Sequence, residues 1–121
     1  MKALVVDDSR AMRLVLTNIL KGHGFEVSEA PHGRAALDHL VKHADTVLAL
    51  IDWNMPEMTG IELLCALKGD QRFAGMKRVM VTTESETSHV TQAAANGADG
   101  FILKPFTKPI VEDKLRSLGL L

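Results

Sequence analysis

One stretch decides the fold, residues 47–60, which read VLALIDWNMPEMTG. Its first five residues are all apolar, without polar alternation, which is typical of a strand buried on both faces of a parallel sheet. Pro56 and Gly60 prevent a strand or helix from continuing, so Asp52 is expected at the end of a central strand. Ligands of open α/β sheets bind at that edge. Asp52 could therefore be a metal ligand, a nucleophile or a helix cap.

The composition is that of an ordinary globular protein. The 121 residues suffice for a single domain, residues 1–121, with 46% hydrophobic residues, 24% charged residues and a net charge of -1. This charge gives no basic field for nucleic acid, and no apolar run suggests a secretory signal or membrane insertion. A single cysteine, Cys65, excludes an internal disulfide and favours a cytoplasmic protein; we expect it to be a small core residue.

Apolar strand patterns alternate with helical periodicity along the whole chain. The patterns predict strands at residues 3–6, 25–30, 47–51, 78–82 and 101–103, and helices at about 10–21, 33–43, 61–67, 86–96 and 109–118. Strict alternation predicts an α/β fold, a doubly wound five-stranded parallel sheet with five helices in the flavodoxin-like order 2-1-3-4-5. The helix at 86–96 carries small side chains, so it should be the least firmly anchored.

Polar side chains follow four of the predicted strands. They are Asp7 and Asp8, Asp52, Thr82 and Lys104. In the predicted strand order the three carboxylates converge and repel one another, which a bound hard cation such as Mg²⁺, or Mn²⁺ in its place, would relieve. Lys104 and Thr82 suit an anion beside that metal. Together the set describes phosphoryl transfer to a carboxylate, with Asp52 as the nucleophile.

The same residues resemble the motifs of response-regulator receiver domains in two-component signalling, above all those of stand-alone chemotaxis regulators. The resemblance rests on the Asp7-Asp8 pair, Asp52 within DWNMP, Thr82, and Lys104-Pro105-Phe106. It implies that Asp52 accepts a phosphoryl group from a phosphohistidine of a sensor histidine kinase or histidine phosphotransfer protein. It also implies that Asp7, Asp8, Asp52 and the main-chain carbonyl of Asn54 hold Mg²⁺.

The resemblance further implies roles around the phosphoryl group. Thr82 would bond this group, Lys104 would pair with it through a cis Lys104–Pro105 peptide, and Phe101 would be the switch aromatic on the output face. That face comprises the fourth helix, fifth strand and fifth helix. Phe101 departs from the tyrosine of the chemotaxis regulators and offers no hydroxyl. Thr83 replaces the usual small residue and is expected to crowd the phosphoryl site, so Thr83→Ala should speed loading, while Asn54 and Glu84 should tune the phosphoryl lifetime.

We therefore expect a cytoplasmic, monomeric switch, not a turnover enzyme. Since the sequence ends soon after the last predicted helix, its output should be a protein partner, for example the flagellar motor switch; a phosphate shuttle in a multistep phosphorelay is the alternative. A flavodoxin-type module would need a phosphate cradle rich in Gly, Ser and Thr in place of Asp7-Asp8-Ser9. A phosphatase of the haloacid dehalogenase type would need a second Asp where Asn54 stands. A degenerate receiver would lack one of the five site residues.

A pair of histidines falls outside this scheme. His39 and His43 are one helical turn apart and offer two ligands for Zn²⁺. The sequence shows no third ligand, so we expect a solvated helix face.

Overall fold

The computed structural model describes residues 1–83 and 90–121. Its five strands form one parallel sheet in the order β2-β1-β3-β4-β5, which confirms the predicted flavodoxin-like topology. The strands are β1 (Lys2–Val6), β2 (Glu26–Ala30), β3 (Thr46–Asp52), β4 (Lys77–Thr83) and β5 (Gly100–Lys104). The helices are α1 (Arg10–Lys21), α2 (Gly33–Lys42), α3 (Gly60–Leu67), α4 (Val90–Ala95) and α5 (Lys108–Ser117). In these two described ranges no helix is long and apolar enough to cross a membrane.

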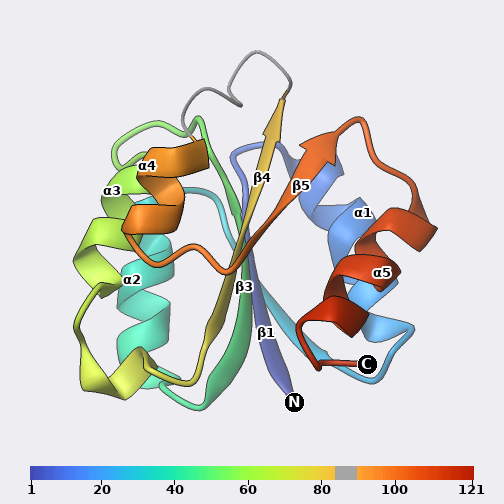
Figure 1. Ribbon diagram of the computed structural model, residues 1–121, viewed down its shortest axis with the longest axis horizontal. Coiled ribbons are helices and arrows are strands. Elements are labelled where there is room, and N and C mark those ends of the chain that lie inside the picture. The colour runs from blue at the N-terminus through green and yellow to red at the C-terminus, as the bar shows by residue number, and fades with distance from the viewer. Residues whose placement is uncertain (84–89) are drawn as a thin grey trace.

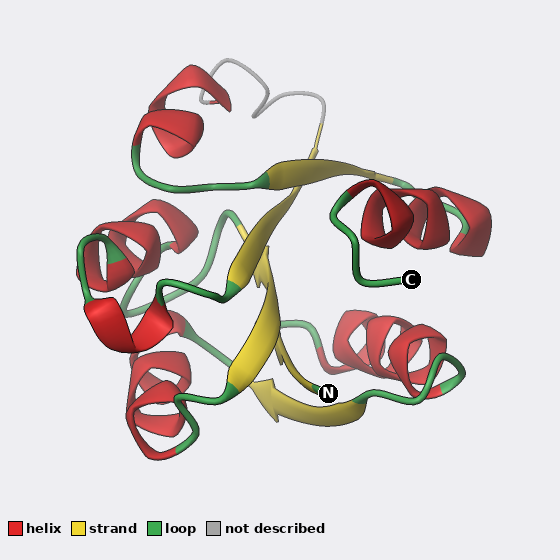
Figure 2. Ribbon diagram, turned by 60° about the horizontal axis from the view of Figure 1, so that its bottom comes forward, coloured by secondary structure: helices red, strands yellow, loops and turns green. Residues whose placement is uncertain are grey.

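Helices cover both faces of the sheet. Figures 1 and 2 show α2, α3 and α4 on one face and α1 and α5 on the other. Alternate residues of β3 point into two hydrophobic clusters on opposite faces of the sheet. Ala49 and Ile51 pack on the side of α2, α3 and α4, whereas Leu48 and Leu50 pack on the side of α1 and α5. All four of these side chains are 0% exposed, which explains why the strand has no polar alternation.

Side-chain caps fix where the helices start beside the carboxyl edge of the sheet. Ser9 Oγ accepts a hydrogen bond from the Met12 amide at 3.2 Å and begins α1. Thr59 and Glu62 form a reciprocal capping box at the start of α3. Pro109 stands in the first turn of α5, as predicted. The Ser9 and Thr59 caps therefore fix where the loops after β1 and β3 end.

α4 is Val90–Ala95, within the predicted helix at 86–96, whose first residues lie outside the described ranges. The prediction for Cys65 was wrong, because this side chain is exposed. α3 turns Leu63, Leu64 and Leu67 into the core, and Cys65 falls on its opposite face.

Gly60, the first residue of α3, packs against the end of β3. A Cβ at this position would lie 2.5 Å from the Asp52 carbonyl oxygen and 2.7 Å from Met80 Cε. We expect Gly60→Ala to lower the free energy of unfolding by about 2 kcal/mol, because overpacking beside rigid backbone is costly.

Gly75 provides the matched control for this substitution. A Cβ there would meet no heavy atom within 4 Å, and neither glycine has a positive φ. Gly75→Ala should change stability by no more than about 0.5 kcal/mol. Urea unfolding followed by circular dichroism compares the two, and equal effects would contradict the close packing at Gly60.

Candidate functional site

Three carboxylates meet at the carboxyl edge of the sheet. Asp7 and Asp8 directly follow β1, and Asp52 is the last residue of its neighbour β3. One oxygen from each carboxylate lies within 4.8 Å of the others. Asp7 is 1% exposed and Asp52 6%, whereas Asp8 is exposed to solvent. In the described part of the chain, this is the one group of three or more potential His, Cys, Asp or Glu ligands so closely spaced.

Lys104 ties two of these carboxylates together. It ends β5 and reaches across β4, so that its Nζ donates to Asp52 Oδ1 at 2.9 Å and to Asp7 Oδ2 at 3.3 Å. The Lys104–Pro105 peptide is cis, as the resemblance implied. Asp7, Asp52 and Lys104 thus meet at one point, although they lie 45 to 97 positions apart in the sequence.

The electrostatics of the site are unfavourable to a charged Asp52. Burial raises the pKa of Asp52 above its ordinary value, and the negative charges of Asp7 and Asp8 act in the same direction, although the hydrogen bond from Lys104 opposes them. Burial also works against the Lys104 ammonium, but the hydrogen bond to Asp52 and the charges of Asp52 and Asp7 outweigh it and raise the pKa of Lys104. The site therefore favours the charged form of Lys104 and disfavours the charged form of Asp52.

Main-chain and side-chain contacts hold Asp7 in place. The Ser9 amide donates to Asp7 Oδ1 at 2.8 Å, and an Arg13 guanidinium nitrogen donates to the Asp7 carbonyl oxygen at 2.7 Å. Arg13 also pairs with Glu29 at 3.1 Å, which links α1 to β2. Sequence reasoning missed Arg13. A basic residue one helical turn after the Ser9 cap indicated a possible contact with the nearby acids. Its partner could not be predicted, because it depends on how α1 packs against the sheet.

Two of the other predicted site residues, Thr82 and Thr83, lie beside this cluster. On β4, Val81 pairs in register with Asp52 and Thr83 pairs with Lys104, so the intervening Thr82 lies beside the site. Thr82 is 3% exposed, and its hydroxyl donates to the Thr83 carbonyl oxygen at 3.3 Å. The remaining three are placed as follows: Asn54 is exposed in the loop after β3, Phe101 is half-buried in β5 against the α2–α3–α4 side of the core, and Glu84 lies outside the described residues.

The donor set suits a hard divalent cation. Three carboxylates offer the oxygen ligands that Mg²⁺ and Mn²⁺ prefer, and one Lys104 ammonium leaves an excess of negative charge among them. Two of the three carboxylates are buried and so cannot be fully screened by water. The residues present therefore fit a magnesium site.

Comparisons with known proteins agree with the geometry. The family model of the response regulator receiver domain matches residues 3–116. Chemotaxis protein CheY1 of Helicobacter pylori is 43% identical over 116 residues, which cover 95% of this chain and 94% of the relative. A CheY homolog of Campylobacter jejuni is 41% identical, with 98% and 92% covered. The crystal structure of Vibrio cholerae CheY4 superposes with a TM-score of 0.88 at 34% identity, covering 96% of both chains.

The raised pKa of Asp52 makes a prediction about stability and pH. The folded state binds the Asp52 proton more tightly than the unfolded state, so ionisation of Asp52 destabilises the fold above its ordinary pKa of 3.8. In EDTA at pH 7, we expect Asp52→Asn to be more stable than the wild type, and this gain to shrink as the pH falls toward 3.8. Urea unfolding across this pH range measures the difference.

Magnesium supplies the control. It should stabilise the wild type more than Asp52→Asn, because a ligand stabilises the state that binds it. Lower stability of Asp52→Asn in EDTA at pH 7 would mean that the attraction to Lys104 outweighs burial and repulsion, contrary to this account.

Proposed function

The chain belongs to the response regulator receiver domain family, and from that premise we propose that it is a phosphorylation-activated switch with Asp52 as the phosphoryl acceptor. One observation carries the proposal: Asp52 is a buried carboxylate that shares a three-carboxylate cluster and accepts a hydrogen bond from Lys104 at 2.9 Å. A purely structural carboxylate would not need two acidic neighbours whose charges oppose its own ionisation.

The reaction is a phosphoryl transfer from a phosphohistidine. A carboxylate oxygen of Asp52 attacks phosphorus, the P–N bond to the donor imidazole breaks, and that imidazole keeps the bonding pair and takes up a proton. The product is an aspartyl phosphate. Burial of Asp52 removes water from the nucleophile, and the Lys104 ammonium counters negative charge on the transferring group.

Asp7, Asp8, Asp52 and the main-chain carbonyl of Asn54 would hold Mg²⁺, with Mn²⁺ as a substitute. When bound, the cation neutralises charge on the phosphoryl oxygens. The chain's own contribution is to keep the carboxylates together. Asp7 is fixed by the Ser9 amide and by Arg13, so its oxygens stay directed at the cluster.

Phosphorylation would convert the site into a switch by changing the partners of Lys104. The phosphoryl group adds nearly two negative charges at Asp52. Lys104, which now bridges Asp52 and Asp7, would turn to the new oxygens, and the Thr82 hydroxyl would bond them too. The ends of β4 and β5 would repack, and Phe101, half-buried in β5, would rotate inward.

The output surface would be the face formed by α4, β5 and α5. Leu103 on β5 is 44% exposed and Ile110 on α5 is 47% exposed, which supports a protein-binding role for this face. Phe101 lies in the same strand, two residues before Leu103. Inward rotation of Phe101 would therefore change the shape of a surface that already presents apolar side chains.

The relatives favour a chemotaxis role. Chemotaxis proteins match over nearly the whole chain, so we propose a sensor histidine kinase or histidine phosphotransfer protein as donor and a downstream protein, such as the flagellar motor switch, as target. We further propose a cytoplasmic monomer that is not a turnover enzyme. The phosphorelay shuttle is the alternative.

Residues beside Asp52 would set how fast it is loaded and cleared. Thr83 pairs in register with Lys104, so its branched side chain would crowd the phosphoryl site and slow loading, as the sequence predicts. Asn54 is exposed in the loop after β3, where it would meet the hydrolytic water. Glu84 would act with it on the phosphoryl lifetime.

Phosphorylation by a small donor tests the proposed function. We expect incubation with Mg²⁺ and acetyl phosphate or phosphoramidate to add one labile phosphoryl group, seen by intact mass, and EDTA or Asp52→Asn to abolish the addition. Asp38→Asn, which removes an exposed carboxylate from α2, should be phosphorylated like the wild type. Persistent labelling of Asp52→Asn, or no labelling of the wild type, would refute Asp52 as the acceptor.

A further inference from the structure

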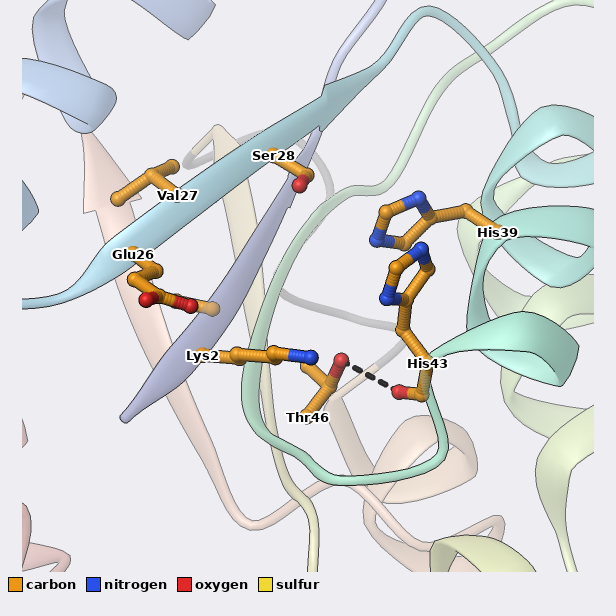
Figure 3. A pocket seen from close by; sticks show the side chains of 8 residues that line it. Lys2, Glu26, Val27, Ser28, His39, His43 and Thr46 are labelled. Carbon is orange, nitrogen blue, oxygen red and sulfur yellow. Dashed lines mark hydrogen bonds between the residues drawn. The ribbon is translucent and has the colours of Figure 1, made fainter.

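A second cluster of polar side chains lies at the opposite end of the sheet from Asp52. A pocket of about 250 Å³ opens between the starts of β1 and β2 and the end of α2 (Figure 3). The residues that line it are Lys2, Ala3, Glu26, Val27, Ser28, His39, His43 and Thr46. This is the end at which the N-terminus lies in Figure 1. None of these residues takes part in the proposed phosphoryl transfer, so the pocket has no role yet.

Two imidazoles form one wall of the pocket. The rings of His39 and His43 are stacked, with centroids 4.3 Å apart and an angle of 19° between their planes. Figure 3 shows a nitrogen of each ring turned toward the pocket. Both residues are half-buried and stacked on each other, which the expectation of a solvated helix face did not include. The cause is the end of α2: His43 caps the helix with φ -132 and ψ 57, which folds its ring back onto that of His39.

The surroundings favour a cation over an anion. The pocket lies at the C-terminal end of α2, where the helix dipole is negative. Glu26 adds a carboxylate to the lining. The positive charge of Lys2 is matched by Asp45, whose carboxylate lies 2.9 Å from Lys2 Nζ.

We propose that His39 and His43 bind a divalent transition-metal ion, of the class of Zn²⁺, Ni²⁺ and Cu²⁺, at the end of α2. Imidazole nitrogen selects these borderline ions, whereas the three carboxylates at the other end select hard ones. Binding turns both rings out of the stack so that their pocket-side nitrogens meet at the ion. Glu26, after a change of rotamer, and water complete the coordination. The site is independent of phosphoryl transfer at Asp52.

Histidine ring resonances report this site directly. We expect Zn²⁺, added in the presence of excess Mg²⁺ to occupy the carboxylate site, to shift the imidazole signals of His39 and His43 and to saturate at one ion per chain. His39→Gln and His43→Gln should each weaken Zn²⁺ binding by roughly tenfold or more, because each removes a ligand. Glu26→Gln should weaken it less, since water can replace the carboxylate.

Two further variants make the outcome decisive. His23→Gln removes a histidine whose Nε2 contacts Glu112 Oε2 at 2.6 Å, and it should bind Zn²⁺ like the wild type. Asp52→Asn should also bind Zn²⁺ normally while losing phosphorylation, so the two proposals fail separately. Zn²⁺ affinity that is unchanged in both His39→Gln and His43→Gln, or that is lost in His23→Gln or Asp52→Asn, would overturn the inference.

Discussion

Three carboxylates repel one another at the carboxyl edge of the sheet. Asp7, Asp8 and Asp52 place their oxygens within 4.8 Å of one another, and Lys104 is the ammonium that bridges two of them. Burial and the negative charges of Asp7 and Asp8 together keep the pKa of Asp52 raised, because the single Lys104 ammonium does not offset them. A bound divalent cation would relieve this excess of negative charge, whereas the proposed phosphoryl group would add to it and so attract the Lys104 ammonium.

The sheet stays folded despite the repulsion among these carboxylates because its central strands are buried on both faces. β3 packs alternate side chains into two separate clusters, and the rigid strand holds Asp52 where water cannot fully solvate it. The parallel order places the ends of β1 and β3 side by side. Folding free energy from the apolar layers therefore offsets the cost of gathering like charges.

Local patterns in the sequence were enough to predict the topology and the meeting of Asp7, Asp8 and Asp52. Both the topology and the meeting of the carboxylates depend on the strand order and on where the strands end. Apolar runs mark the strands, and proline and glycine mark their ends. Contacts that depend on docking were harder to predict. The second bond of Lys104 to Asp7, the anchoring of Asp7 by Arg13 and the stacking of His39 on His43 require the exact placement of helices and strand ends. Cys65 was misplaced because its apolar character outweighed its helical phase in the prediction.

A crystal structure of the protein grown with Mn²⁺ tests directly whether the three carboxylates hold a cation, because the anomalous scattering of Mn²⁺ locates the ion without reference to activity. We expect one strong anomalous peak among the carboxylates of Asp7, Asp8 and Asp52, at about 2.2 Å from the coordinating oxygens. An ion bound elsewhere, or carboxylates that separate and leave the edge of the sheet without an ion, would contradict this expectation.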